Sequence, residues 1–139
     1  MSITQAMCTS FKQELMNEEH DLNSDTIKIA LFTSSATLNA TTTAYSTSNE
    51  ISGTGYTAGG VTLTSAALAT SGTTAFADFA DASWTSATFT ANGAVIYNSS
   101  ASNKAIVVLA FGGDFTVTAG TFSVVFPAAD ASNAIIRLA

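Results

Sequence analysis

The chain has 139 residues, of which 47% are apolar and only 10% are charged, and its formal net charge is −6. Because it carries only three Lys and one Arg, it lacks the basic surface that neutralises phosphates on nucleic acids or anionic membranes. No run approaches the roughly 18 apolar residues of a transmembrane helix, so we expect no nucleic acid and no membrane among its partners.

Hydroxyl groups, rather than charges, make this surface polar. The chain has 22 Thr and 17 Ser, whereas about 25% of an average globular protein is charged. Such a surface is weakly protected from sticking to a neighbour. It suits either an adhesively neutral extracellular domain or a body lodged in an assembly. The length suits one domain over 1–139, with 1–25 as an N-terminal helix or arm and 26–139 as the main fold.

The start of the chain predicts one helix, over residues 2–17. Ser2 and Gln5 have the spacing of a capping box. An apolar residue recurs at every fourth position, which places one stripe along the helix: Ile3, Met7, Phe11 and Leu15. The helix either covers an open end of the fold or is an arm whose stripe docks on a partner protein.

No basic segment followed by an apolar core is present near the N-terminus, so we expect no signal peptide. Cys8 is the only cysteine, which excludes an intramolecular disulfide. We therefore expect synthesis in a reducing cytoplasm.

Residues 26–32 alternate between apolar and polar or small side chains and predict the first strand. The next segment, 33–60, has no convincing periodicity, and a loop of this length in a compact domain is usually functional or flexible. We expect three apolar side chains to anchor it or to meet a neighbour: Tyr45, Ile51 and Tyr56.

The remaining strands are short and bounded by Gly, Asn, Asp or Ser. Residues 105–111 form the longest apolar run, which Gly112 and Gly113 interrupt. Two runs separated by Ala119-Gly120 predict a hairpin, with strands over 115–118 and 121–126. Further strands are expected over 61–65, 74–79, 88–90, 93–97 and 134–138. The pattern predicts an all-β, jelly-roll-like sandwich of about eight strands with one N-terminal helix.

The chemical motifs carry little weight. Residues 53–58 match a dinucleotide-binding fingerprint, but they lack the preceding strand and following helix, so the glycines are better explained by turns with positive φ. His20, the only histidine, lies in a charged run that we expect to be solvated, and Cys8 is explained by packing. Asp78 and Asp81 fit turn capping better than calcium binding. We expect no enzyme activity, no catalytic residue, no metal and no cofactor.

Trp84 lies in a polar segment and is the best candidate for an exposed recognition group, which could stack on a sugar or bind a protein. A tryptophan in the core or capping a sheet edge explains the same residue, and we favour that alternative.

Several segments resemble a family of small structural proteins of tailed phages and prophages, among them capsid cement (decoration) proteins. The resemblance spans nearly the whole chain and is carried by residues 11–15, 25–38, 43–60, 91–98 and 130–137. It implies a jelly-roll protein on the outside of the virion, made in the bacterial cytoplasm, that ties neighbouring major capsid protein subunits together. It also implies self-association, as a homodimer or alternatively a trimer, and no catalytic residue.

On this interpretation, the contacts with other proteins come from the N-terminal arm, the 33–60 loop, Trp84 and exposed strand edges. The expected interface residues are Phe11, Leu15, Tyr45, Ile51, Tyr56 and Trp84. The main alternative is a receptor- or glycan-binding module of a phage tail or fibre, because jelly rolls also serve as lectins.

Overall fold

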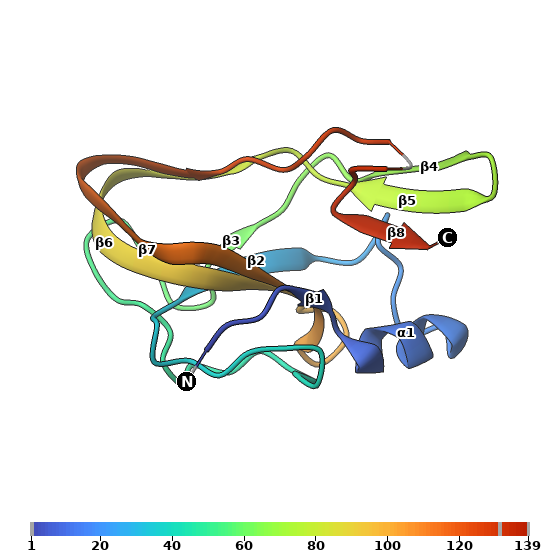
Figure 1. Cartoon of the computed structure of the whole chain (residues 1–139), viewed down its shortest axis with the longest axis horizontal. Helices are drawn as coiled ribbons and strands as arrows, with labels where there is room; N and C mark the ends of the chain where they lie inside the picture. Colours follow the sequence, from blue (N-terminus) through green and yellow to red (C-terminus); the bar gives the residue numbers. More distant parts are fainter. Residues whose placement is uncertain (1, 131, 139) are drawn as a thin grey trace.

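The computed structural model describes residues 2–130 and 132–138, which form two antiparallel sheets and one short helix (Figure 1). The larger sheet has the order β1-β7-β6-β2-β3, and the smaller has the order β4-β5-β8. The bounds are β1 Ala6–Met7, α1 Thr9–Met16, β2 Ile27–Phe32, β3 Val61–Thr62, β4 Ala67–Ser71, β5 Thr74–Asp78, β6 Ala82–Asn98, β7 Lys104–Val124 and β8 Ile136–Leu138. The predicted all-β sandwich with one N-terminal helix is confirmed.

A long hairpin of β6 and β7 dominates the fold. The two strands pair from Ala82↔Val124 to Asn98↔Lys104, and the ladder shifts register around Gly93. In Figure 1 the pair curves through one end of the molecule, so its outer half returns at the level of β4 and β5. One bent pair of strands therefore contributes to both layers of the sandwich.

The predicted hairpin at Ala119-Gly120 is wrong. β7 continues through this position and through Gly112-Gly113, and the turn of the real hairpin lies at 99–103. Ala119 has a φ of 46° and Gly112 a φ of 83°. Both lie in a strand with shifted register, so the glycine-containing pairs mark irregularities in one strand rather than its ends.

The helix is shorter than expected, because residues 3–7 are extended. β1 pairs with β7 through Ala6↔Val108, and the backbone N–H of Thr4 donates to the carbonyl of Leu38 at 2.8 Å. Gln5, the expected capping-box partner, instead accepts a hydrogen bond from the N–H of Ala110 at 3.3 Å. A free edge of β7 offers this segment ladder hydrogen bonds, which outweigh the local capping signal.

The core lies between the layers and is centred on β2, β6 and β7. Phe32, Ile29 and Leu31 of β2 are buried, as are Val95 and Val108 of the hairpin. β2 agrees with the predicted 26–32, and β5 with the predicted 74–79, whereas the segments predicted over 88–90 and 93–97 belong to the single strand β6. β4 was not predicted, because all five of its residues are exposed and they lack apolar alternation.

Candidate functional site

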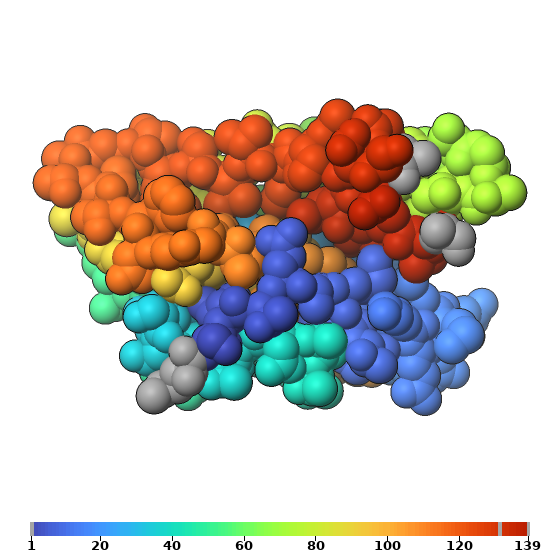
Figure 2. All heavy atoms as spheres, viewed as in Figure 1, coloured from blue at the N-terminus to red at the C-terminus, as the bar shows by residue number. Residues whose placement is uncertain are grey.

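A groove lies between α1 and the smaller sheet, at one end of the sandwich. Its volume is about 770 Å³. Figure 2 shows a notch between the helix and the β4–β5 hairpin at the right-hand end. Phe11 and Leu15 contribute from the helix, and Leu68, Phe76 and Leu138 from the sheet. We call this feature the α1 groove; it is large enough for several apolar side chains of a ligand or partner.

The α1 groove is open because the outer strands of the smaller sheet, β4 and β8, are covered less than its middle. Ala77 and Ile136 are 3% exposed, whereas Leu68, the partner of Ala77 on β4, and Leu138 on β8 are 53% and 45% exposed. Two residues of the predicted apolar stripe face the core, as expected. Phe11 is fully buried, and Leu15 packs against the core cluster. α1 therefore lies at the open end of the sandwich, which agrees with the first of the two interpretations of the helix. It covers this end only in part, and the groove remains open.

The charged groups along the α1 groove are acidic. Glu18 and Asp21 line it, and no Lys or Arg does so among the described residues. The Asp21 carboxylate accepts hydrogen bonds from the N–H groups of Asn23 and Ser24, which fixes the turn after the helix. The groove thus combines an apolar wall with a negatively charged rim.

A second apolar feature lies along β7, near the bend of the hairpin. Phe111, Phe115, Phe122 and Val125 line a hollow of about 260 Å³. Phe115 and Val125 are 53% and 72% exposed. The ring of Phe111 packs against both Phe115 and Phe122, with centroids 6.3 and 6.1 Å away. We call this feature the β7 hollow.

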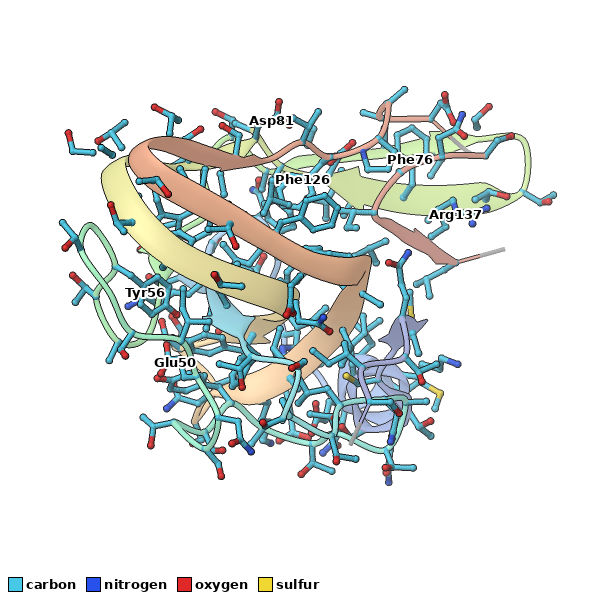
Figure 3. The ribbon with its side chains drawn as sticks, turned by 60° about the vertical axis from the view of Figure 1, so that its left-hand side comes forward. Glu50, Tyr56, Phe76, Asp81, Phe126 and Arg137 are labelled. Carbon is cyan, nitrogen blue, oxygen red and sulfur yellow. The ribbon has the colours of Figure 1, made fainter. Side chains whose placement is uncertain are left out.

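Glu50 holds the 33–60 loop against the sandwich. Its carboxylate accepts hydrogen bonds from the Tyr45 hydroxyl at 2.6 Å, the Tyr56 hydroxyl at 2.5 Å and the Gly59 N–H at 2.8 Å. The Tyr56 hydroxyl also accepts from the N–H of Leu31 in β2, at 3.0 Å. Figure 3 shows Glu50 and Tyr56 on this loop beside the larger sheet. The loop is therefore held in place by a partly buried cluster of hydrogen bonds centred on Glu50.

Burial and the Glu50 carboxylate affect the tyrosines of this cluster. Burial is the main cause that raises the pKa of Tyr45 and Tyr56 well above the ordinary value, with the bonds to Glu50 second. Burial, followed by the charge of Glu50, raises the pKa of Tyr97 to about 12. The Tyr97 hydroxyl donates to the carbonyl of Gly59 at 2.6 Å, so all three tyrosines tie the loop to the core in their neutral form.

The glycines of the same loop allow close approach to the strands. Gly53 and Gly55 have positive φ values and lie against the backbone of β6, and a Cβ on Gly60 would overlap the carbonyl of Ile29. The expectation that residues 53–58 form turns with positive φ is confirmed for both of its glycines.

His20 is not solvated as expected. Its side chain is fully buried, and its ring packs edge-on against Phe11 at 5.0 Å. The buried Asn98 accepts from the Ser100 N–H and donates to His20 Nδ1 at 3.0 Å and to Asp25 at 2.7 Å. His20 Nδ1 is thus an acceptor, and Nε2 donates to Glu14 at 2.8 Å. His20 therefore links Glu14 of α1 to Asn98 at the end of β6 by hydrogen bonds. The charged neighbours of His20 in the sequence did not indicate this contact.

Three of the six expected interface residues belong to the core of the chain itself. Phe11, Ile51 and Trp84 are 0%, 5% and 3% exposed, so their side chains offer little surface to another protein in this conformation, and their part in an interface stays a prediction. Trp84 packs among Tyr56, Phe89 and Phe122, in agreement with the alternative of a core tryptophan. Leu15, Tyr45 and Tyr56 are partly buried, and their part in an interface stays a prediction.

The other candidate residues form local contacts. Asp78 is 5% exposed and accepts from the Phe79 N–H, and burial is the main cause that raises the pKa of its carboxyl group. Asp81 accepts a hydrogen bond from the N–H of Phe126 at 2.9 Å, and Figure 3 shows Asp81 and Phe126 in the upper layer.

Cys8 is buried at the N-cap of α1, and burial raises the pKa of its thiol to about 11. Among residues 2–130 and 132–138, no group of three or more His, Cys, Asp or Glu is placed to hold a metal ion.

The exposed apolar residues of the β7 hollow carry partial signals in the sequence, whereas those of the smaller sheet do not. Val124 and Val125 are adjacent at the end of a strand, so one of them has to face outward. Phe115 follows Asp114 in a segment rich in hydroxyl side chains, which indicates solvent. Leu68 had no signal, because it is one apolar residue among small and polar neighbours.

Comparisons with protein families, with curated proteins and with solved structures found no match to this chain. Of the helices in the described part of the chain, none is long and apolar enough to cross a membrane.

Proposed function

We propose that this chain is a structural virion protein that decorates the outer surface of an icosahedral phage capsid and cements neighbouring major capsid protein subunits. The observation that carries the proposal is the presence of two separate apolar surfaces on one body. The α1 groove is lined by residues of 11–22, β4, β5 and β8, and the β7 hollow by residues 111–125, so the two share no lining residue.

A cement protein has to contact two neighbours at once and to resist their separation. Two spatially separate apolar surfaces on one rigid sandwich meet this requirement, because each can contact a different subunit. Modest affinity at each end becomes strong attachment when both ends are engaged. The low charge content also suits a protein packed among many neighbours.

The resemblance to tailed-phage decoration proteins supports the same function, and it extends the proposal to self-association as a homodimer, with a trimer as the alternative. The molar mass of the purified protein, measured by analytical ultracentrifugation, distinguishes these states from a monomer.

The glycan-binding alternative has lost its main residue, because Trp84 is buried in the core. It remains an outcome of the test: binding of the purified protein to a glycan array, without binding to heads, would favour a tail or fibre module.

The test is co-sedimentation with phage heads that lack this protein. The wild type is compared with a groove variant, Leu68→Asp with Leu138→Asp, and a hollow variant, Phe115→Asp with Val125→Asp. All four side chains are about half exposed or more, so both variants are expected to fold, which a thermal melt checks.

We expect the wild type to bind at hundreds of copies per head, and each variant to bind about 100-fold more weakly, because one of two linked contacts is lost. Absence of wild-type binding, or saturation at only about six to eighteen copies, as expected of a component of a single tail, would refute the proposal.

A further inference from the structure

We propose that the α1 groove binds an amphipathic segment of the partner protein, whose apolar side chains enter the groove and whose Lys or Arg side chains face Glu18 and Asp21. This inference rests on the proposed function for the identity of the partner, the major capsid protein. The chemistry of the occupant is argued from the groove alone.

The wall of the groove selects an apolar face. Leu68 and Leu138 remain about half exposed on the two outer strands of the smaller sheet, and they line the groove together with Leu15 of α1. A volume of about 770 Å³ exceeds the space that one side chain fills, and it is open at the end of the sandwich (Figure 2). A segment with several apolar side chains in a row removes these groups from water, which is favourable in proportion to the area covered.

The rim selects the charge of the occupant. Glu18 and Asp21 both line the groove, and residues 1–25 carry five acidic groups and one basic group. No Lys or Arg of the described residues lines the groove, and Lys104 is paired with Glu19. An acidic segment is repelled here, whereas Lys or Arg gains favourable interactions that speed association and set orientation.

The direct test uses two synthetic peptides as probes: an amphipathic peptide of Leu and Lys, and the matched peptide of Leu and Glu. Binding is measured by fluorescence anisotropy, and the site is located from the NMR methyl signals of Leu15, Leu68 and Leu138. We expect the Leu/Lys peptide to bind at these methyl groups, at least about tenfold more tightly than the Leu/Glu peptide, and to weaken as salt is raised.

Two pairs of charge-neutralising variants separate the rim from the overall charge. Glu18→Gln with Asp21→Asn removes two charges at the groove, and Asn keeps an acceptor for the turn. Asp114→Asn with Asp130→Asn removes two charges elsewhere. We expect the first pair to reduce the preference for the Leu/Lys peptide about tenfold and the second to leave it nearly unchanged.

Equal binding of the two peptides, equal effects of the two variant pairs, or methyl shifts confined to residues outside the groove would overturn this inference. The outcome is separable from that of the proposed function. Peptide binding in the groove without any binding to heads contradicts the cement function only. Binding of the wild type to heads, lost in both the groove variant and the hollow variant, together with equal binding of the two peptides contradicts the groove inference only.

Discussion

Replacement of Glu50 by Ala tests whether one carboxylate holds the 33–60 loop in place. The variant removes the shared acceptor of two tyrosine hydroxyls and the Gly59 N–H. A hydrogen bond to a charged group contributes about 1.5–3 kcal/mol. Glu50 and Tyr45 are only partly buried, so water can replace some of the three lost hydrogen bonds in the variant. We therefore expect the free energy of unfolding to decrease by about 3 kcal/mol in total.

For a chain of 139 residues, that loss corresponds to a decrease in Tm of about 10 °C. Urea unfolding gives the free energy, and calorimetry gives Tm. The matched control is Glu18→Ala, because Glu18 is exposed and its carboxylate bonds no other described residue; it should change stability by less than about 0.5 kcal/mol.

A double-mutant cycle with Tyr56→Phe makes the test specific. Because both substitutions remove the same hydrogen bond, their effects should be non-additive by about 1 kcal/mol or more. Additive effects, or a loss for Glu50→Ala no larger than that of the control, would refute the assignment of Glu50 as the acceptor that fixes the loop.

Three further outcomes are expected. The pKa of Tyr97 is raised to about 12 in the folded protein, so the stability it contributes is complete below pH 10, its ordinary pKa, and is lost as pH rises towards 12; urea melts should show a decline above pH 10, and Tyr97→Phe should make it less steep without abolishing it, because the pKa values of Tyr45 and Tyr56 are also raised. Asn98→Ala removes the main cause that lowers the pKa of Asp25; that pKa should rise towards its ordinary value in an NMR titration, with a loss of about 3 kcal/mol in stability because Asn98 is fully buried. Gly60→Ala should prevent folding or cost about 4 kcal/mol or more, because its Cβ overlaps the Ile29 carbonyl. The control Gly72→Ala, also at positive φ but with open space around it, should cost about 1 kcal/mol in thermal melts.

The strands with strong local patterns could be predicted from the sequence. β2 has a run of apolar residues next to a clear loop, and its predicted bounds agree with the structure within one residue. The all-β class followed from many short apolar runs separated by turn residues. These signals are local, so they need no knowledge of what lies opposite in space.

The errors arose where a distant partner decides the local structure. Residues 3–7 have a helical apolar pattern, but they pair with Leu38 and β7, which lie far along the chain. Ala119-Gly120 has the composition of a hairpin turn, but β6 continues opposite it and absorbs it as an irregularity of β7. His20 lies in a charged run, and only the fold brings Asn98 to it.

The candidate site was predicted in part. Phe11 and Leu15, which belong to the predicted apolar stripe of the helix, line the α1 groove. The other wall, with Leu68 and Leu138, comes from two strands whose pairing partner, β5, has to be known first. Because the groove exists only where two distant segments meet, no single stretch of sequence contains it.

The most direct measurement of the central claim is the temperature at which filled phage heads release their DNA. If the protein ties neighbouring subunits together, heads carrying the wild type should release DNA at a higher temperature than heads without it. Heads saturated with the groove variant or the hollow variant should behave like undecorated heads, because one-ended attachment bridges nothing. Equal release temperatures for decorated and undecorated heads would contradict the account.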